Sequence, residues 1–128
     1  MSRESRQLGV RFGFLTLWVA ILLWLPVEDT GPLNPRILAI LAGILLAIRG
    51  FLRIRRAGVL AAAGFGLAAG LLVNPITAGL MVFKSGLHGH SIPDFSVAML
   101  ASVLADTPIY GLGGLMIGAG LYYLVRSE

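Results

Sequence analysis

This sequence has no cysteine and few charged residues. None of its 128 residues is cysteine, which excludes disulfides, thiolate metal sites and cysteine nucleophiles. Only 12% of the residues are charged, against roughly 25% in a typical soluble domain. A soluble fold of this size needs a more polar surface. The composition therefore excludes an ordinary soluble enzyme, a disordered chain and a nucleic-acid-binding domain.

Hydrophobic residues and glycine are abundant instead. Hydrophobic residues make up 57% of the chain, and glycine occupies 17 positions, about twice its usual share. A spanning helix needs roughly 20 apolar residues, so this length leaves room for about four spans in one domain. The sequence predicts a small all-α integral membrane protein that is embedded in the lipid bilayer.

Four apolar runs are the candidate transmembrane helices. After a cytoplasmic tail at 1–11, they cover residues 12–27, 36–52, 57–83 and 108–125. Asn74-Pro75 is expected to kink the third run, because proline lacks the N–H that continues a helix. Residues 84–107 are expected to face outward and to hold a short helix at 94–105. That helix is too short to cross a bilayer, so it is either interfacial or re-entrant.

The basic residues predict the orientation of these spans. Eight of the ten fall on one side: Arg3, Arg6, Arg11, Arg49, Arg53, Arg55, Arg56 and Arg126. Only Arg36 and Lys84 fall on the other side. Because cytoplasmic loops carry the excess of Lys and Arg, both termini are predicted to be cytoplasmic, with the chain in the cell membrane.

Small residues recur at four-residue intervals in three of the runs. They are Gly58, Ala62, Gly66 and Gly70 in the third run, Gly114 and Gly118 in the last, and Ala39, Gly43 and Ala47 in the second. Residues four apart share a helix face, and small faces allow close helix approach in lipid. These faces pack the chain's own helices together, or they dock a second copy or another membrane subunit. Our leading expectation is a non-enzymatic membrane subunit that assembles through them.

Two polar residues inside apolar segments support an alternative function, a small ion or proton channel or transporter. Asn74 lies deep in the third run, and Asp106 lies between 94–105 and the last run. A carboxylate at membrane depth is a candidate proton or cation site, especially beside a broken helix. Each residue also has a structural explanation. Asn74 can bond to the backbone at a kink, and Asp106 can stabilise a helix N-terminus at the outer interface.

The two histidines, His88 and His90, form a candidate metal site with Asp94. Imidazole and carboxylate groups bind Zn²⁺ or Cu²⁺, but the same residues also suit an exposed polar turn, and nearby Lys84 would repel a cation. No catalytic constellation such as Gly-x-Ser-x-Gly or His-Glu-x-x-His is present. A membrane-embedded enzyme is therefore the second alternative function, with no catalytic residue to name and no particular cofactor indicated.

Overall fold

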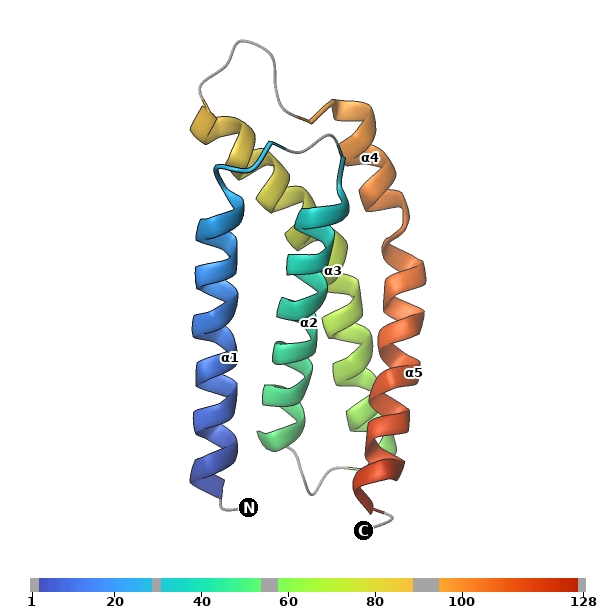
Figure 1. Ribbon diagram of the computed structural model, residues 1–128. Helices are drawn as coiled ribbons and strands as arrows, with labels where there is room; N and C mark the ends of the chain where they lie inside the picture. The colour runs from blue at the N-terminus through green and yellow to red at the C-terminus, as the bar shows by residue number, and fades with distance from the viewer. Residues whose placement is uncertain (1–2, 29–30, 54–57, 89–94, 127–128) are drawn as a thin grey trace.

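The chain is all-helical in the computed structural model, which describes residues 3–28, 31–53, 58–88 and 95–126. The described residues form α1 (Arg3–Trp24), α2 (Leu33–Arg53), α3 (Val59–His88), α4 (Val97–Ala105) and α5 (Thr107–Arg126). Figure 1 shows the four long helices running side by side, with both chain termini at the same end of the bundle. The helical fold class predicted from the sequence is confirmed.

In the described part of the chain, four helical segments are long and apolar enough to cross a membrane, the number that the sequence predicts. They are Gln7–Trp24, Leu33–Phe51, Val59–Leu87 and Val97–Leu124. The last of these joins α4 to α5, because Asp106 alone separates the two helices. Figure 1 accordingly shows α4 continuing the line of α5, so the short helix does not lie apart from the bundle.

Local sequence explains why α4 and α5 are two helices. Ser96 caps α4 by accepting a hydrogen bond from the backbone N–H of Met99 at 3.2 Å. Pro108 has no N–H to bond back into α4, so the regular ladder cannot pass through it. The helix restarts at Asp106, whose carbonyl accepts from the N–H of Tyr110. The result is one span with a break at a carboxylate.

α3 is the central helix, and its glycines form a very close contact with α5. A Cβ atom added at Gly66, Gly70 or Gly118 would lie only 2.1, 2.1 or 2.3 Å from a backbone carbonyl oxygen of the facing helix. Those oxygens belong to Gly114, Tyr110 and Ala62 respectively. No side chain fits between backbones this close. Small residues therefore decide how α3 and α5 meet, as expected for helices packed by van der Waals contact.

α2 also packs closely against α3, and α1 packs mainly against α2. A Cβ added at Gly43 would lie 3.3 Å from the carbonyl oxygen of Ala69 in α3. Gly43 of α2 faces Val73 of α3, and a Cβ there would lie 3.2 Å from the Val73 side chain. A buried cluster joins α1 to α2, α3, α4 and the short segment before α4; it comprises Leu17, Trp24, Leu38, Met81, Phe95 and Val103. Figure 1 shows α3 changing direction part-way along, which fits the internal Pro75.

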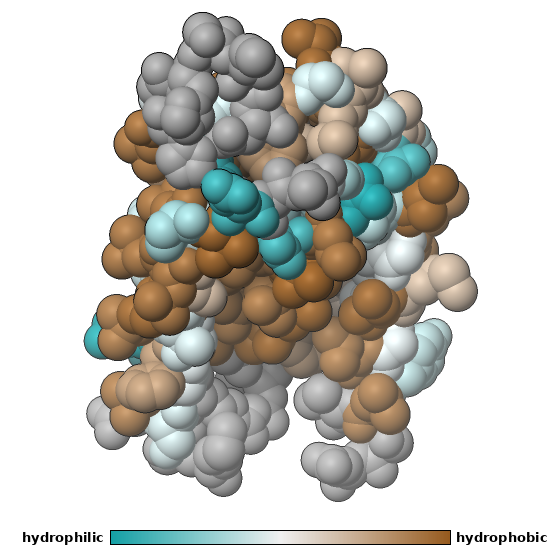
Figure 2. Space-filling model, turned by 45° about the horizontal axis from the view of Figure 1, so that its top comes forward, coloured by the Kyte–Doolittle hydropathy of each residue, from teal (hydrophilic) through white to brown (hydrophobic). Residues whose placement is uncertain are grey.

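The outer surface of the bundle is strongly apolar. Large hydrophobic side chains are exposed on every helix, among them Leu15 (61%), Leu60 (85%), Val97 (81%) and Met116 (73%). Figure 2 shows hydrophobic residues over most of the coloured face, with hydrophilic ones gathered in a narrow band across it. An apolar surface this extensive suits lipid and not water as its surroundings.

Candidate functional site

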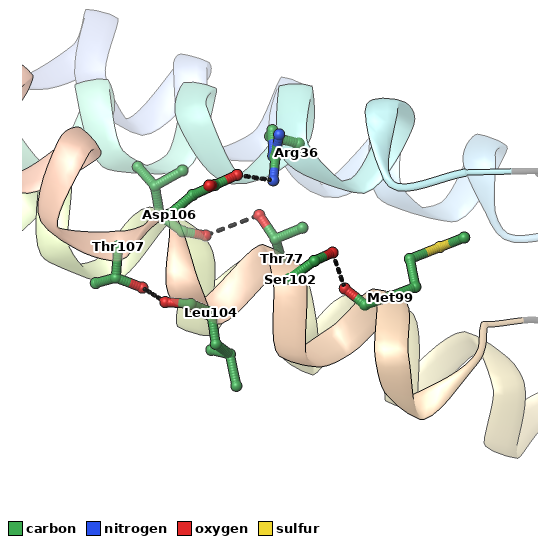
Figure 3. Close-up of polar contacts among 8 residues, drawn as sticks. Arg36, Thr77, Met99, Ser102, Leu104, Asp106 and Thr107 are labelled. Carbon is green, nitrogen blue, oxygen red and sulfur yellow. Dashed lines mark hydrogen bonds and ion pairs between the residues drawn. The ribbon is translucent and has the colours of Figure 1, made fainter.

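An ion pair joins the start of α2 to the junction between α4 and α5. Nη2 of Arg36 donates to Oδ2 of Asp106 at 3.0 Å, and Figure 3 shows the two side chains pointing toward each other. The guanidinium carbon of Arg36 also lies 5.6 Å from the ring centroid of Tyr110, within cation–π range. Arg36 therefore contacts both the carboxylate at the helix break and the first turn of α5.

Asn74 lies at the level of Asp106 because of the register between α3 and α5. Gly70 meets Tyr110, and each step of four residues along α3 is matched by a step of four back along α5. One further step from Gly70 leads to Asn74, and the matching step from Tyr110 leads to Asp106. The two residues that the sequence suggests for an ion path thus lie at one level of the bundle. We call Arg36, Asn74 and Asp106 the polar cluster: Arg36 and Asp106 are in direct contact, and Asn74 is grouped with them by the helix register alone.

Three buried polar atoms of the cluster have no hydrogen-bond partner among the residues that the structure describes. They are Nδ2 and Oδ1 of Asn74 and Nε of Arg36. The Asn74 side chain is wholly buried, with 0% of its surface exposed. Leaving a buried polar group without a partner costs about 1–3 kcal/mol, so such groups are rare and need an explanation.

The next buried polar residue along this face of α3 behaves differently. Thr77 is also 0% exposed, but its hydroxyl donates to the carbonyl oxygen of Val73 at 2.8 Å. This bond back to the preceding turn satisfies the hydroxyl within its own helix. Asn74 makes no such bond, so the backbone bonding that would explain it as a purely structural residue is absent from the described contacts.

Lys84 is buried, although a single lysine after an apolar run is typical of an interface. Only 1% of its surface is exposed, and Nζ lies 4.3 Å from the ring centroid of Trp24. Nζ also donates to the carbonyl oxygen of Val27. These contacts attach the C-terminal part of α3 to the end of α1. Neither Lys84 nor Arg36 is a candidate from sequence, because each stands beside an apolar run where a charge ordinarily reaches the headgroups.

The glycines expected at helix contacts fall into two groups. Gly43, Gly66, Gly70, Gly114 and Gly118 all face another helix of the same chain. Gly58 precedes α3 and is exposed, and a Cβ added there would meet no atom within 4 Å. The small-residue faces that contain Gly66 and Gly70 of α3 and Gly114 and Gly118 of α5 therefore cover each other. Other glycines of these two helices have open space around them: Gly64, Gly79, Gly113 and Gly120.

The candidate metal site lies largely beyond what the structure places. His90 and Asp94 are outside the described residues, and His88 ends α3 with its side chain likewise outside them. Within the described part of the chain, no group of three His, Cys, Asp or Glu side chains could hold a metal ion. The site therefore stays a prediction from sequence.

No protein-family model matches the chain, and comparisons with curated proteins and with solved structures find no match. Function must therefore be inferred from the site. The polar cluster offers one guanidinium, one carboxylate and one amide, with two donor groups and one acceptor still unpaired. Such a set can bind a small polar solute by hydrogen bonds and charge.

Proposed function

We propose that this chain is a small membrane transport protein, a channel or a carrier, in which the polar cluster binds the solute on its way across. The observation that carries the proposal is the Asn74 amide, which is wholly buried at the level of an ion pair and has no hydrogen-bond partner among the described residues. Ionisable residues within a span are costly, and they ordinarily mark a path for ions or substrates. In this proposal both termini face the cytoplasm, and the end of the bundle that holds α4 faces the outside of the cell.

The length of α2 supports a position for the cluster inside the hydrocarbon layer. Arg49, which is exposed, lies thirteen helical steps after Arg36, about 20 Å of helix, whereas the hydrocarbon layer is about 30 Å thick. With Arg49 at one interface, Arg36 lies about 10 Å below the other. α4 extends the apolar surface beyond Asp106 by nine residues, about 14 Å, and its first residue, Val97, is 81% exposed.

One helix break and one proline inside a continuous helix flank the cluster, which also supports transport. α4 and α5 are interrupted at Asp106, and Pro75 follows Asn74 directly in α3. Proline cannot donate to the carbonyl four residues earlier, so the carbonyl of Leu71 loses its partner in the helix ladder. Transporters use such broken helices at mid-membrane, where freed backbone groups face the solute.

The subunit function expected from the small-residue faces has less support. The glycines of α3 and α5 contact each other within one chain, so assembly would need a different surface. The unpaired amide of Asn74 has no role in a subunit that only packs. Transport accounts for both observations, because the glycines close the bundle around the cluster.

Flux across liposomes tests the proposal. Purified protein is reconstituted, and the passage of protons and of monovalent ions is followed with internal dyes under an imposed gradient. We expect wild-type protein to conduct one of these ions and Asp106→Asn to abolish that flux. Ser102→Ala is the matched control, because Ser102 lies in α4, is exposed and donates its hydroxyl hydrogen bond to the carbonyl oxygen of Met99 in its own helix. Equal flux in wild type and Asp106→Asn would contradict the proposal.

A further inference from the structure

The unpaired atoms of the polar cluster indicate what kind of solute it takes. Two of the unpaired groups are donors, the Nε–H of Arg36 and the Nδ2 amide of Asn74, and only Oδ1 of Asn74 is an acceptor. A bare metal cation needs several oxygen ligands and would lie beside a guanidinium. The cluster therefore suits an acceptor of hydrogen bonds better than it suits a cation.

The ion pair uses only half of the guanidinium edge that is available. Asp106 reaches Nη2 of Arg36 through one oxygen at 3.0 Å, while Nε has no partner. Carboxylates and other oxyanions commonly bind arginine through two parallel hydrogen bonds, because the spacing of the guanidinium N–H groups matches their two oxygens. An anion with two oxygens would thus gain a bond that Asp106 does not make.

The charges around the cluster are compatible with an added anion. The buried or half-buried charged side chains in this half of the described bundle are Arg36, Lys84 and Asp106, two cations against one anion. The Asp106 side chain is 44% exposed, so other side chains of the bundle do not enclose it when it leaves the guanidinium.

We infer that the polar cluster binds a small oxyanion, held by the Nε and Nη2 groups of Arg36 and by the amide of Asn74, with Asp106 occupying the guanidinium when the site is free. This inference rests on the proposed transport function and names its substrate class. Asp106 acts as a tethered competitor, which keeps Arg36 paired between binding events and displaces the bound anion. Without this charge the anion stays on Arg36, so the loss of flux expected for Asp106→Asn follows from failed release. The alternative is that only water bonds to these unpaired atoms, and the experiment must distinguish it from oxyanion binding.

Binding is tested on the purified protein in detergent, with sodium formate and sodium nitrate as probes and sodium chloride at equal ionic strength as reference. A ligand that binds only the folded protein raises its unfolding temperature with increasing concentration. We expect formate or nitrate to raise the unfolding temperature in a saturable manner and chloride to leave it unchanged. Arg36→Lys should lose the response, because lysine keeps the charge but not the two-donor edge.

Two further variants make the result specific. Asn74→Leu has the same number of side-chain heavy atoms, and we expect at least a tenfold weaker response to formate or nitrate. Arg49→Lys, at the opposite end of α2, should respond like wild type. The inference is overturned if no oxyanion shifts unfolding, if chloride shifts it equally, or if Asn74→Leu responds fully. Cation flux in liposomes without oxyanion binding would overturn this inference and leave transport standing, whereas the absence of any flux would remove both.

Discussion

Arg36 and Asp106 stand 70 residues apart in the sequence, yet their side chains meet at 3.0 Å between α2 and the break in the last span. The contact fixes the start of α2 against the point where α4 gives way to α5. Arg36 also lies over the ring of Tyr110. Asp106 and Tyr110, at the start of α5, thus both contact one guanidinium. This pairing makes the break in the last span part of a site and not merely a bend.

A double-mutant cycle should show that the pair is coupled. Arg36→Met and Asp106→Asn each leave a charged partner uncompensated. The double variant should therefore lose less free energy of unfolding than the sum of the two single losses. We expect a coupling of about 1 kcal/mol, the upper range for partly exposed pairs, measured by unfolding in mixed micelles. Strictly additive effects would show that the two side chains do not act as a pair.

Gly66→Ala should disrupt the bundle although it adds only one methyl group. The new Cβ would lie 2.1 Å from the carbonyl oxygen of Gly114, so α3 and α5 must separate. We expect the free energy of unfolding to fall by about 3 kcal/mol, at the upper end of the cost of overpacking, as measured by thermal unfolding in detergent.

Gly64→Ala is the matched control for that prediction. Gly64 lies on the exposed side of α3, and a Cβ there meets no atom within 4 Å. Alanine in place of a helical glycine should stabilise the protein by about 0.5–1 kcal/mol. Similar losses in both variants would mean that Gly66 does not mark a helix contact.

Asn74→Leu should separate stability from function. Replacing a buried, unpaired amide by an apolar group removes its desolvation cost, so unfolding in the absence of solute should become less favourable by about 1–3 kcal/mol. The same variant should lose flux in liposomes, because the cluster loses its amide. Thermal unfolding and flux are measured on one preparation. A variant that is less stable yet fully active would show that Asn74 serves the fold alone.

Lys84 and Trp24 should matter more to stability than their place near loops suggests. Lys84→Met removes a donor to the Val27 carbonyl and the cation over the Trp24 ring, and should lower the free energy of unfolding by about 1–3 kcal/mol.

Trp24→Leu should destabilise the protein more than Trp18→Leu, because Trp24 is 6% exposed and Trp18 is 63% exposed. Thermal unfolding ranks the variants, and an equal effect of the two tryptophan substitutions would argue against the packed end of α1.

Single-cysteine labelling should establish the orientation, since the chain has no cysteine of its own. Ser5 and Glu28 are exposed and stand at opposite ends of α1. With the N-terminus cytoplasmic, a membrane-impermeant maleimide should label Glu28→Cys in intact cells and Ser5→Cys only after permeabilisation. The reverse pattern would invert the orientation predicted from the basic residues.

The candidate site was only partly predictable. Asn74 and Asp106 stand out in the sequence because polar residues within apolar runs are costly to bury. Arg36 and Lys84 do not, because a charge at the end of an apolar run ordinarily reaches the headgroups. What neither kind of signal contains is the register of two helices, which depends on where their backbones can touch.

The sequence by itself determined that the chain is helical and how many membrane-length segments it holds, since both follow from apolar run length and from the breaks at proline. It also placed small residues on common faces. Only the tertiary structure decided which faces meet, because the close contacts of Gly66 and Gly70 set the register of α3 on α5. That register brings Asn74 level with Asp106, and the packing of α2 brings Arg36 to the same point. A site assembled from three distant segments depends on contacts that no single stretch of sequence encodes.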